Sequence, residues 1–229
     1  MNKNILIIGG SSGIGAALSN KLANQNNVYC ASRTPTPIPG VTSIAYDVLE
    51  NDLDLQALPD TLEGLVYCPG SINLRPFKGL KPDTFRSDFE LNLIGAVRTL
   101  QRVLPKLQQA TASSIVFFST VAVQTGMPYH ASVAAAKGAI EGLTRSLAAE
   151  LAPTVRVNAI APSLVNTPLA DKFLNSQEKI ERAGERHPLQ RVGTPEEIAA
   201  LAAFLLSEEA AWMTGQILTA DGGIGTLKS

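Results

Sequence analysis

The sequence predicts an α/β fold, a doubly wound parallel sheet with helices on both faces. Short runs rich in Val, Ile, Leu and aromatic residues alternate with segments of helical periodicity, as is typical of sheets built from strand–helix–strand units. Several of these runs are apolar on both faces, as expected of strands that helices cover from both sides. The chain has 229 residues and no evident linker, so we expect a single domain over residues 1–229.

The expected elements follow from these two patterns. Runs that are short and rich in Val, Ile, Leu or aromatic residues are interpreted as strands. In chain order they are NILIIGG (4–10), NVYCASR (27–33), SIAYDV (43–48), LEGLVYC (62–68), SSIVFFS (113–119), VRVNAIAP (155–162) and GQILTADGG (215–223). Helical periodicity is found at residues 16–24, 85–108, 133–151 and 195–206.

Three segments interrupt the alternation of strand and helix. Residues 34–40 are expected to form a proline-punctuated loop, and residues 51–64 a short polar crossover at a place where a full helix is expected. Residues 164–193 form a long excursion after the strand that ends in NAIAP. A long segment that leaves the carboxyl edge of a parallel sheet is a candidate substrate lid, and a helical surface insertion is the alternative.

Composition and charge exclude several classes of partner. The chain is 45% hydrophobic and 17% charged with a net charge of -1, so we expect no nucleic acid and no membrane partner. The longest apolar run, residues 198–206, is far shorter than the roughly 20 residues of a spanning helix. The apolar run near the N-terminus is too short for a signal peptide, so a cytoplasmic location is expected. Cys30 and Cys68 lie in expected strands, which favours buried reduced thiols over a disulfide or metal site.

A glycine cluster, IIGGSSGIGAAL (7–18), lies between the first expected strand and the first expected helix. Gly9 can make the tight turn, Gly13 lets the backbone approach a pyrophosphate, and Gly15 lets the helix pack on the strand. The helix N-terminus would then face the anion. A plain strand-to-helix turn is the alternative, but the position in the first strand–helix–strand unit favours a dinucleotide site.

The second expected strand ends in Ser32 and Arg33. In dinucleotide-binding folds the residue here meets the adenosine ribose, and a carboxylate selects the cofactor without a 2'-phosphate. No carboxylate is present, and a guanidinium can hold a phosphate with charge-assisted hydrogen bonds. This favours NADP(H) over NAD(H), and a solvated arginine is the alternative.

At this point the residues indicate a family, because the chain resembles the short-chain dehydrogenase/reductases over residues 4–223. The resemblance lies in GGSSGIG (9–15), YDV (46–48), ELNLIGA (90–96), VNAIAPSLVNTPLA (157–170) and the segment from QRVGTPEE to LTADGG (190–223). It implies a Rossmann fold and places Asp47 against the adenine amino group. The cofactor-binding residues expected from the loop, the ribose position and the resemblance are Gly9, Ser11, Ser12, Gly13, Ile14, Gly15, Ser32, Arg33, Asp47, Gly70, Lys137, Pro162 and Thr167.

The family's chemistry, as the resemblance implies it, rests on an Asn, a Ser, a Tyr and a Lys. Asn92 matches the asparagine that holds a water relay, and Thr120, with Ser119 beside it, matches the serine that hydrogen-bonds the substrate. Lys137 matches the lysine that lowers the tyrosine pKa and binds the nicotinamide ribose. The tyrosine's position is Val133, which has no proton to give.

The family pattern is altered at two further places near the nicotinamide. Where the family has the sequence NNAG, this chain has YCPG (67–70). Where the family has a glycine after its proline, here Pro162, this chain has Ser163. The change at Val133 is therefore one of several in the expected substrate pocket, whereas the cofactor-binding motifs are nearly complete.

Two nearby side chains could supply the missing proton. Tyr129 lies four residues before Val133 and His130 three, and both would share its face if the helix began early. His130 has the more suitable reference pKa, near 6.5, for acid–base chemistry at neutral pH. Structural roles for both, with Tyr129 in the pocket wall, are the alternatives. His187, in the long excursion, is interpreted as a surface or hinge residue.

These residues leave two functional hypotheses. The first is an NADP(H)-dependent oxidoreductase that transfers a hydride to or from an activated C=O or C=N group in a small-molecule substrate, with a nonstandard proton route. The second is a catalytically weak cofactor-binding protein that acts as a sensor or as a subunit of an oligomer. The resemblance also implies a homotetramer or homodimer, in which the helices at 85–108 and 133–151 pair across the interface.

Overall fold

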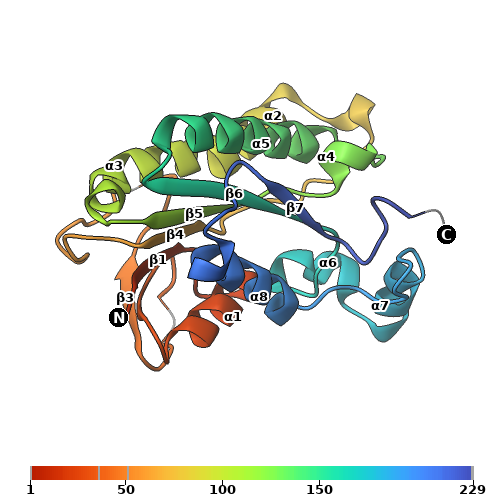
Figure 1. Ribbon diagram of the computed structural model, residues 1–229. Helices are drawn as coiled ribbons and strands as arrows, with labels where there is room; N and C mark the ends of the chain where they lie inside the picture. Colours follow the sequence, from red (N-terminus) through yellow and green to blue (C-terminus); the bar gives the residue numbers. More distant parts are fainter. Residues whose placement is uncertain (1, 36, 51, 228–229) are drawn as a thin grey trace.

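The computed structural model describes residues 2–35, 37–50 and 52–227, and at its centre lies a parallel sheet of seven strands (Figure 1). The strands lie in the order β3-β2-β1-β4-β5-β6-β7, and every neighbouring pair is parallel. Their bounds are β1 (Asn4–Ile8), β2 (Asn27–Ser32), β3 (Val41–Ala45), β4 (Gly64–Tyr67), β5 (Ser113–Phe118), β6 (Val155–Pro162) and β7 (Ile217–Ala220). The predicted doubly wound parallel sheet is confirmed, and each expected run contributes one strand. The first and last residues of the expected domain, one residue of the loop 34–40 and one of the crossover 51–64 lie outside the described residues.

Helices cover both faces of the sheet. One face carries α2 (Pro82–Phe89), α3 (Gly95–Gln109) and α5 (Ala131–Leu151), drawn above the sheet in Figure 1. The other carries α1 (Gly13–Leu22) and α8 (Pro195–Leu206), which contact each other. Within the described residues, no helix combines the length and the apolarity needed to cross a membrane.

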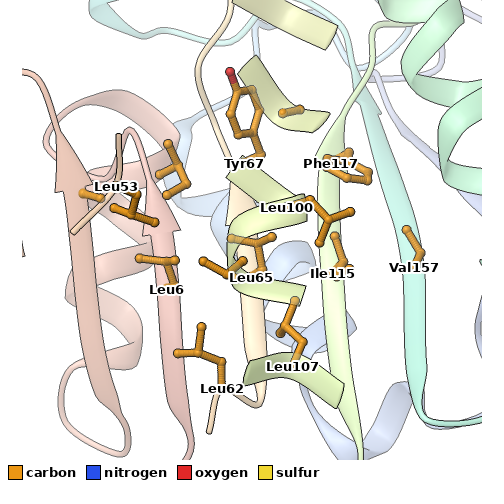
Figure 2. Packing of buried hydrophobic residues seen from close by; sticks show 14 of the residues in the cluster. Leu6, Leu53, Leu62, Leu65, Tyr67, Leu100, Leu107, Ile115, Phe117 and Val157 are labelled. Atoms are coloured by element: carbon orange, nitrogen blue, oxygen red, sulfur yellow. The ribbon is translucent and has the colours of Figure 1, made fainter. Parts of the chain in front are cut away.

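The core has two halves because successive side chains of a strand point to opposite faces. In β1, Leu6 packs with Leu65 and Leu100 on the face under α3 and α5, as Figure 2 shows. Ile5 and Ile7 pack with the residues of α1 and α8 on the other face. These side chains are almost fully buried, which stabilises the fold by about 2 kcal/mol for each.

The expected helix at residues 85–108 is interrupted. It consists of α2, a π-helical turn at Glu90–Ile94, and α3, and Asn92 lies in the π turn. A π turn widens the hydrogen-bonded ring by one residue, and periodicity in the sequence does not indicate it. The other expected helices are present, with starts at Gly13 and Ala131 that lie before the expected residues 16 and 133.

The long excursion at residues 164–193 contains helices of its own. They are a 3-10 turn at Pro168–Ala170, α6 (Asp171–Leu174) and α7 (Gln177–Gly184). Ser176 caps α7, because its hydroxyl accepts a hydrogen bond from the Lys179 amide at 3.3 Å. The segment thus leaves the carboxyl end of β6 and places two short helices beside the sheet edge (Figure 1). A further short helix, α4 (Ala122–Thr125), follows β5.

Candidate active site

The carboxyl ends of β1, β2 and β4 border a cavity of about 580 Å³. This is the edge of a doubly wound sheet, near the switch in strand order, where such folds bind ligands. Of the thirteen predicted cofactor-binding residues, those that line this cavity are Gly9, Ser11, Ser12, Gly13, Ile14, Gly15, Ser32, Arg33, Asp47, Gly70 and Thr167. The other two, Lys137 and Pro162, line a second cavity described below.

The glycine loop adopts the backbone that its residues permit. Gly9 and Gly13 have positive φ angles of 75° and 52°, which favour glycine. A Cβ atom on Gly15 would lie 2.3 Å from the carbonyl oxygen of Gly9, so only glycine lets α1 approach β1 this closely. The N-cap residue of α1, Ser12, makes no side-chain cap, which leaves its hydroxyl and the first helix amides available to an anion.

The far end of the cavity holds one basic and one acidic side chain. Arg33 is exposed and takes part in no ion pair within the described residues, and Ser32 donates its hydroxyl hydrogen bond to the Thr34 carbonyl oxygen at 3.2 Å. Asp47 accepts a hydrogen bond from the Leu49 amide on Oδ1 at 2.9 Å. A guanidinium without a carboxylate partner at this place suits an anionic group.

A second cavity, of about 460 Å³, adjoins the first. Cys68, Gly70 and Thr167 are among the residues that line both. Burial raises the pKa of the Cys68 thiol to about 12, so this sulfur is protonated at neutral pH. Within the part of the chain that the structure describes, no tyrosine lines the second cavity.

Lys137, Val133 and Thr120 meet in the second cavity. Val133 and Lys137 lie one turn apart on α5, and both are buried. Burial lowers the pKa of Lys137 to about 8, because an ammonium group loses its hydration there. The side chain of Thr120 accepts a weak hydrogen bond from the Ala122 amide at 3.3 Å, so its hydroxyl hydrogen can face the cavity.

Asn92 lies behind this group and is fully buried. Its Nδ2 donates hydrogen bonds to the Asp88 carbonyl oxygen at 2.8 Å and to the Ser71 hydroxyl at 2.9 Å. A Cβ atom on Gly70 would lie 3.3 Å from Asn92 Oδ1 and 3.4 Å from Lys137 Nζ, so both polar atoms approach the same glycine. The structure thus brings Asn92 and Lys137 together as the sequence predicts.

A buried acid in this neighbourhood was not anticipated from the sequence. Asp88 is fully buried, and its Oδ1 accepts hydrogen bonds from Ser71 at 2.5 Å and Asn73 at 2.7 Å. Its Oδ2 has no partner within the described residues, and its charge opposes the fall in the Lys137 pKa. The sequence does hold an indication that Asp88 lies near Asn92, because Asp88 stands four residues earlier and this spacing places two residues on the same face of a helix.

Of the two proposed proton donors, His130 lines the second cavity and Tyr129 does not. His130 lines the second cavity and is the N-cap residue of α5, with Nδ1 2.7 Å from the Pro128 carbonyl oxygen. A carbonyl can only accept, so Nδ1 carries the hydrogen and Nε2 remains for the cavity. Tyr129 precedes the helix with a φ of 71°, is 58% exposed, and does not line the cavity.

His187 is buried, so its interpretation as a surface residue was wrong. It is 4% exposed, lines the second cavity, and packs against Gly222. Its Nδ1 lies 2.9 Å from the Ala183 carbonyl oxygen and its Nε2 lies 2.9 Å from the Ser163 hydroxyl. Because Nδ1 must donate to the carbonyl, neutral His187 accepts the Ser163 hydrogen on Nε2. Position in the sequence alone could not indicate this pair, since its members are joined by the folding of the long excursion.

Comparisons with known proteins identify the family. A family model described as "Enoyl-(Acyl carrier protein) reductase" matches residues 54–225. The chain is 32% identical to the uncharacterized oxidoreductase YmfI of Bacillus subtilis, over 97% of this chain and 99% of that protein. The chain belongs to the short-chain dehydrogenase/reductase family.

Solved structures of other proteins have the same fold. The ligand-free aldohexose dehydrogenase of Thermoplasma acidophilum superposes with a TM-score of 0.91 at 27% identity, covering 100% of this chain and 97% of that one. ElxO, in a structure with NADP bound, has a TM-score of 0.88 at 26% identity, covering 98% of this chain and 99% of that one. We therefore class the protein as a short-chain oxidoreductase, one whose second cavity is lined without a tyrosine in the described residues.

Proposed function

We propose that the protein is an NADP(H)-dependent oxidoreductase that transfers a hydride to or from an activated C=O or C=N group and moves the proton without a tyrosine. The observation that best supports this proposal is that the two cavities adjoin and share lining residues. The glycine-loop cavity opens into a pocket where Lys137 and Thr120 remain and Val133 takes the place expected for a phenol.

The residues of the first cavity fit a nicotinamide dinucleotide. The uncapped N-terminus of α1 and the cradle at Gly9, Gly13 and Gly15 suit a pyrophosphate, and Arg33 suits a 2'-phosphate. Lys137 would bind the nicotinamide ribose, and Asp47 the adenine amino group. Bound there, the dinucleotide would supply or accept the hydride.

The proton must come from another group in the pocket. In its cationic form His130 could donate the hydrogen on Nε2. In its cationic form His187 could pass its Nε2 proton to the Ser163 oxygen while the Ser163 hydroxyl hydrogen moves to the substrate. Thr120 can hydrogen-bond the oxygen or nitrogen that gains negative charge. General acid catalysis contributes roughly 10²- to 10⁴-fold in rate, so plain ketones would react slowly wherever these histidines are neutral, and strongly activated carbonyls or iminium groups would depend on them less.

The excursion at residues 164–193 serves in this proposal as the substrate lid. Leu164, Phe173 and Arg182 are among its residues that line the second cavity. Val165 forms a bridge with Gly193, so the two ends of the segment are tied together and the helices between them can move as a unit.

The proposal is tested by incubating the protein with NADPH and a panel of diketones, quinones, imines and pterins while following nicotinamide absorbance. We expect oxidation of NADPH with at least one activated substrate, and a slower rate in both Ser163→Ala and His187→Gln. Tight NADPH binding without turnover of any substrate would instead favour the cofactor-binding protein.

A further inference from the structure

The second cavity has a basic rim formed by α7 and the turn after it. Lys179 and Arg182, three residues apart, lie on one side of α7, Arg186 lies in the turn that follows, and all three line the cavity. The acids of the same segment, Glu178, Glu181 and Glu185, do not line it.

These cations have no counter-ion among the residues that the structure describes. Within the described residues, no ion pair includes Lys179, Arg182 or Arg186, whereas other basic side chains do have carboxylate partners. Lys179 Nζ donates only to the neutral Asn175 amide oxygen, at 2.7 Å. Moreover, no Asp or Glu of the described residues lines the cavity, so every charged side chain in its lining is basic or a histidine.

The cations do not belong to the dinucleotide cavity. That cavity is lined by Arg33 as its basic residue and includes none of the three side chains of the α7 rim. Their position is at the outer side of the second cavity, where all three are exposed.

The interior of the second cavity is apolar. Ile72, Met127, Leu164 and Phe173 contribute to its wall, and Val133 lies beside Lys137 at its inner end. A volume of about 460 Å³ is within the range of small-molecule sites, roughly 300–1,000 Å³. A ligand that satisfies both features has an apolar body and an anionic end.

We propose that the substrate is an anionic amphiphile: an apolar chain or ring whose carboxylate or phosphate is held by Lys179, Arg182 and Arg186, with its reacting group near Thr120 and Lys137. The assignment of the reacting group rests on the proposed function, whereas the recognition of the anion does not. Charge at the rim and apolar contact inside would orient the substrate with its reducible group inward.

The test measures binding by calorimetry without turnover, using octanoate, octyl phosphate and the neutral isostere octanamide. We expect both anions to bind at least about tenfold more tightly than octanamide at low salt, with the preference weakening as salt is added. The double variant Arg182→Gln/Arg186→Gln should remove most of this preference. Lys21→Gln, which removes one exposed cation from α1 outside both cavities, should leave it unchanged. The anion with the lower dissociation constant identifies the head group that the site prefers.

The proposal would be overturned if octanamide bound as tightly as octanoate. It would also be overturned if the double variant kept the preference for anions. A double variant that loses NADPH affinity instead, with anion preference intact, would assign the cations to the cofactor and also overturn it. If octanoate binds as expected and no activated carbonyl is reduced with NADPH, the proposed function fails while the anion site stands.

Discussion

Lys137 and Val133 lie one turn apart on α5, and both are buried in the wall of the second cavity. Their spacing on a helix predicts a shared face, and the structure places both in the wall of one cavity. Helical spacing is local and so can be read from the sequence. His187 shows the opposite case, because its burial and its contact with Ser163 depend on how a long segment folds back on the sheet.

Val133→Tyr should increase carbonyl reduction with NADPH. The variant adds a phenol one turn from Lys137, whose charge lowers the phenol pKa, and general acid catalysis is worth roughly 10²-fold or more in rate. Steady-state kinetics on plain ketones would measure the gain. Val133→Phe is the matched control, because it adds the ring without the hydroxyl and should give no increase. An unchanged rate in a folded Val133→Tyr that binds NADPH would show that more than a proton donor is missing.

Lys137→Met should stabilise the protein without cofactor while weakening its binding of NADPH. Burial lowers the pKa of Lys137 from 10.5 to about 8, so below pH 8 both folded and unfolded chains carry the charge and folding bears the cost of burying it. Removing the charge should raise the free energy of unfolding at pH 7 by on the order of 2 kcal/mol.

The pH dependence supplies the check on this reasoning. Between pH 8 and 10.5 the folded protein releases a proton that the unfolded chain keeps, so the wild type gains stability from this group as pH rises. The advantage of Lys137→Met, measured by urea unfolding, should therefore shrink from pH 7 to pH 10. A stability difference that does not vary with pH would contradict the buried-charge explanation.

Arg33→Ala should lower the preference for NADP(H) over NAD(H). Arg33 has no ion-pair partner in the described chain and lines the dinucleotide cavity, so a 2'-phosphate is its expected partner. Loss of a charge-assisted contact should weaken NADPH binding about tenfold or more and leave NADH binding nearly unchanged. Titration of both cofactors measures the ratio, with Arg33→Lys as an intermediate case. Equal affinity of the wild type for both cofactors would refute the charge argument.

At the scale of elements, the strands and the major helices are predictable because their patterns are local. The π turn at Asn92 is not, since it inserts one residue into a helix whose periodicity continues on either side. The helices of the excursion are likewise unpredicted in detail. The short α6 buries only Leu174, and α7 is largely polar, so neither has a strong apolar stripe of its own. The first helix is predictable because glycines mark where its backbone must approach the strand.

Gly15→Ala should damage the junction of β1 and α1. The new methyl group would lie 2.3 Å from a backbone oxygen, and backbone cannot rotate away as a side chain can. We expect a loss of about 2 kcal/mol or more in the free energy of unfolding, together with weaker NADPH binding. Gly138→Ala in α5 is the control, since its Cβ would meet Val123 at an ordinary 3.7 Å. Equal stability of the two variants in thermal unfolding would argue against the close approach.

At the scale of the whole molecule, one helix face is left uncovered by the residues that the structure describes. On α5 the small residues Ala135, Gly142, Ser146 and Ala149 are exposed, although the rest of the helix packs on the sheet and on α2. A Cβ atom on Gly142 would meet nothing within 4 Å. Small exposed residues allow the close approach of another helix, which agrees with the homotetramer or homodimer that the resemblance implies.

Gly142→Leu should therefore reduce the size of the assembly. The Cβ of a leucine here meets no described residue within 4 Å outside the helix's own backbone, so the fold of the subunit should stay intact, but the side chain would separate two α5 helices that pack against each other. Light scattering at micromolar concentration should give a tetramer or dimer for the wild type and a smaller mass for Gly142→Leu. Gly79→Leu, at another open position in the short turn Phe77–Gly79, is the control and should keep the wild-type mass. A monomeric wild type would reject the oligomer altogether, whereas an unchanged mass in Gly142→Leu would move the interface to another face.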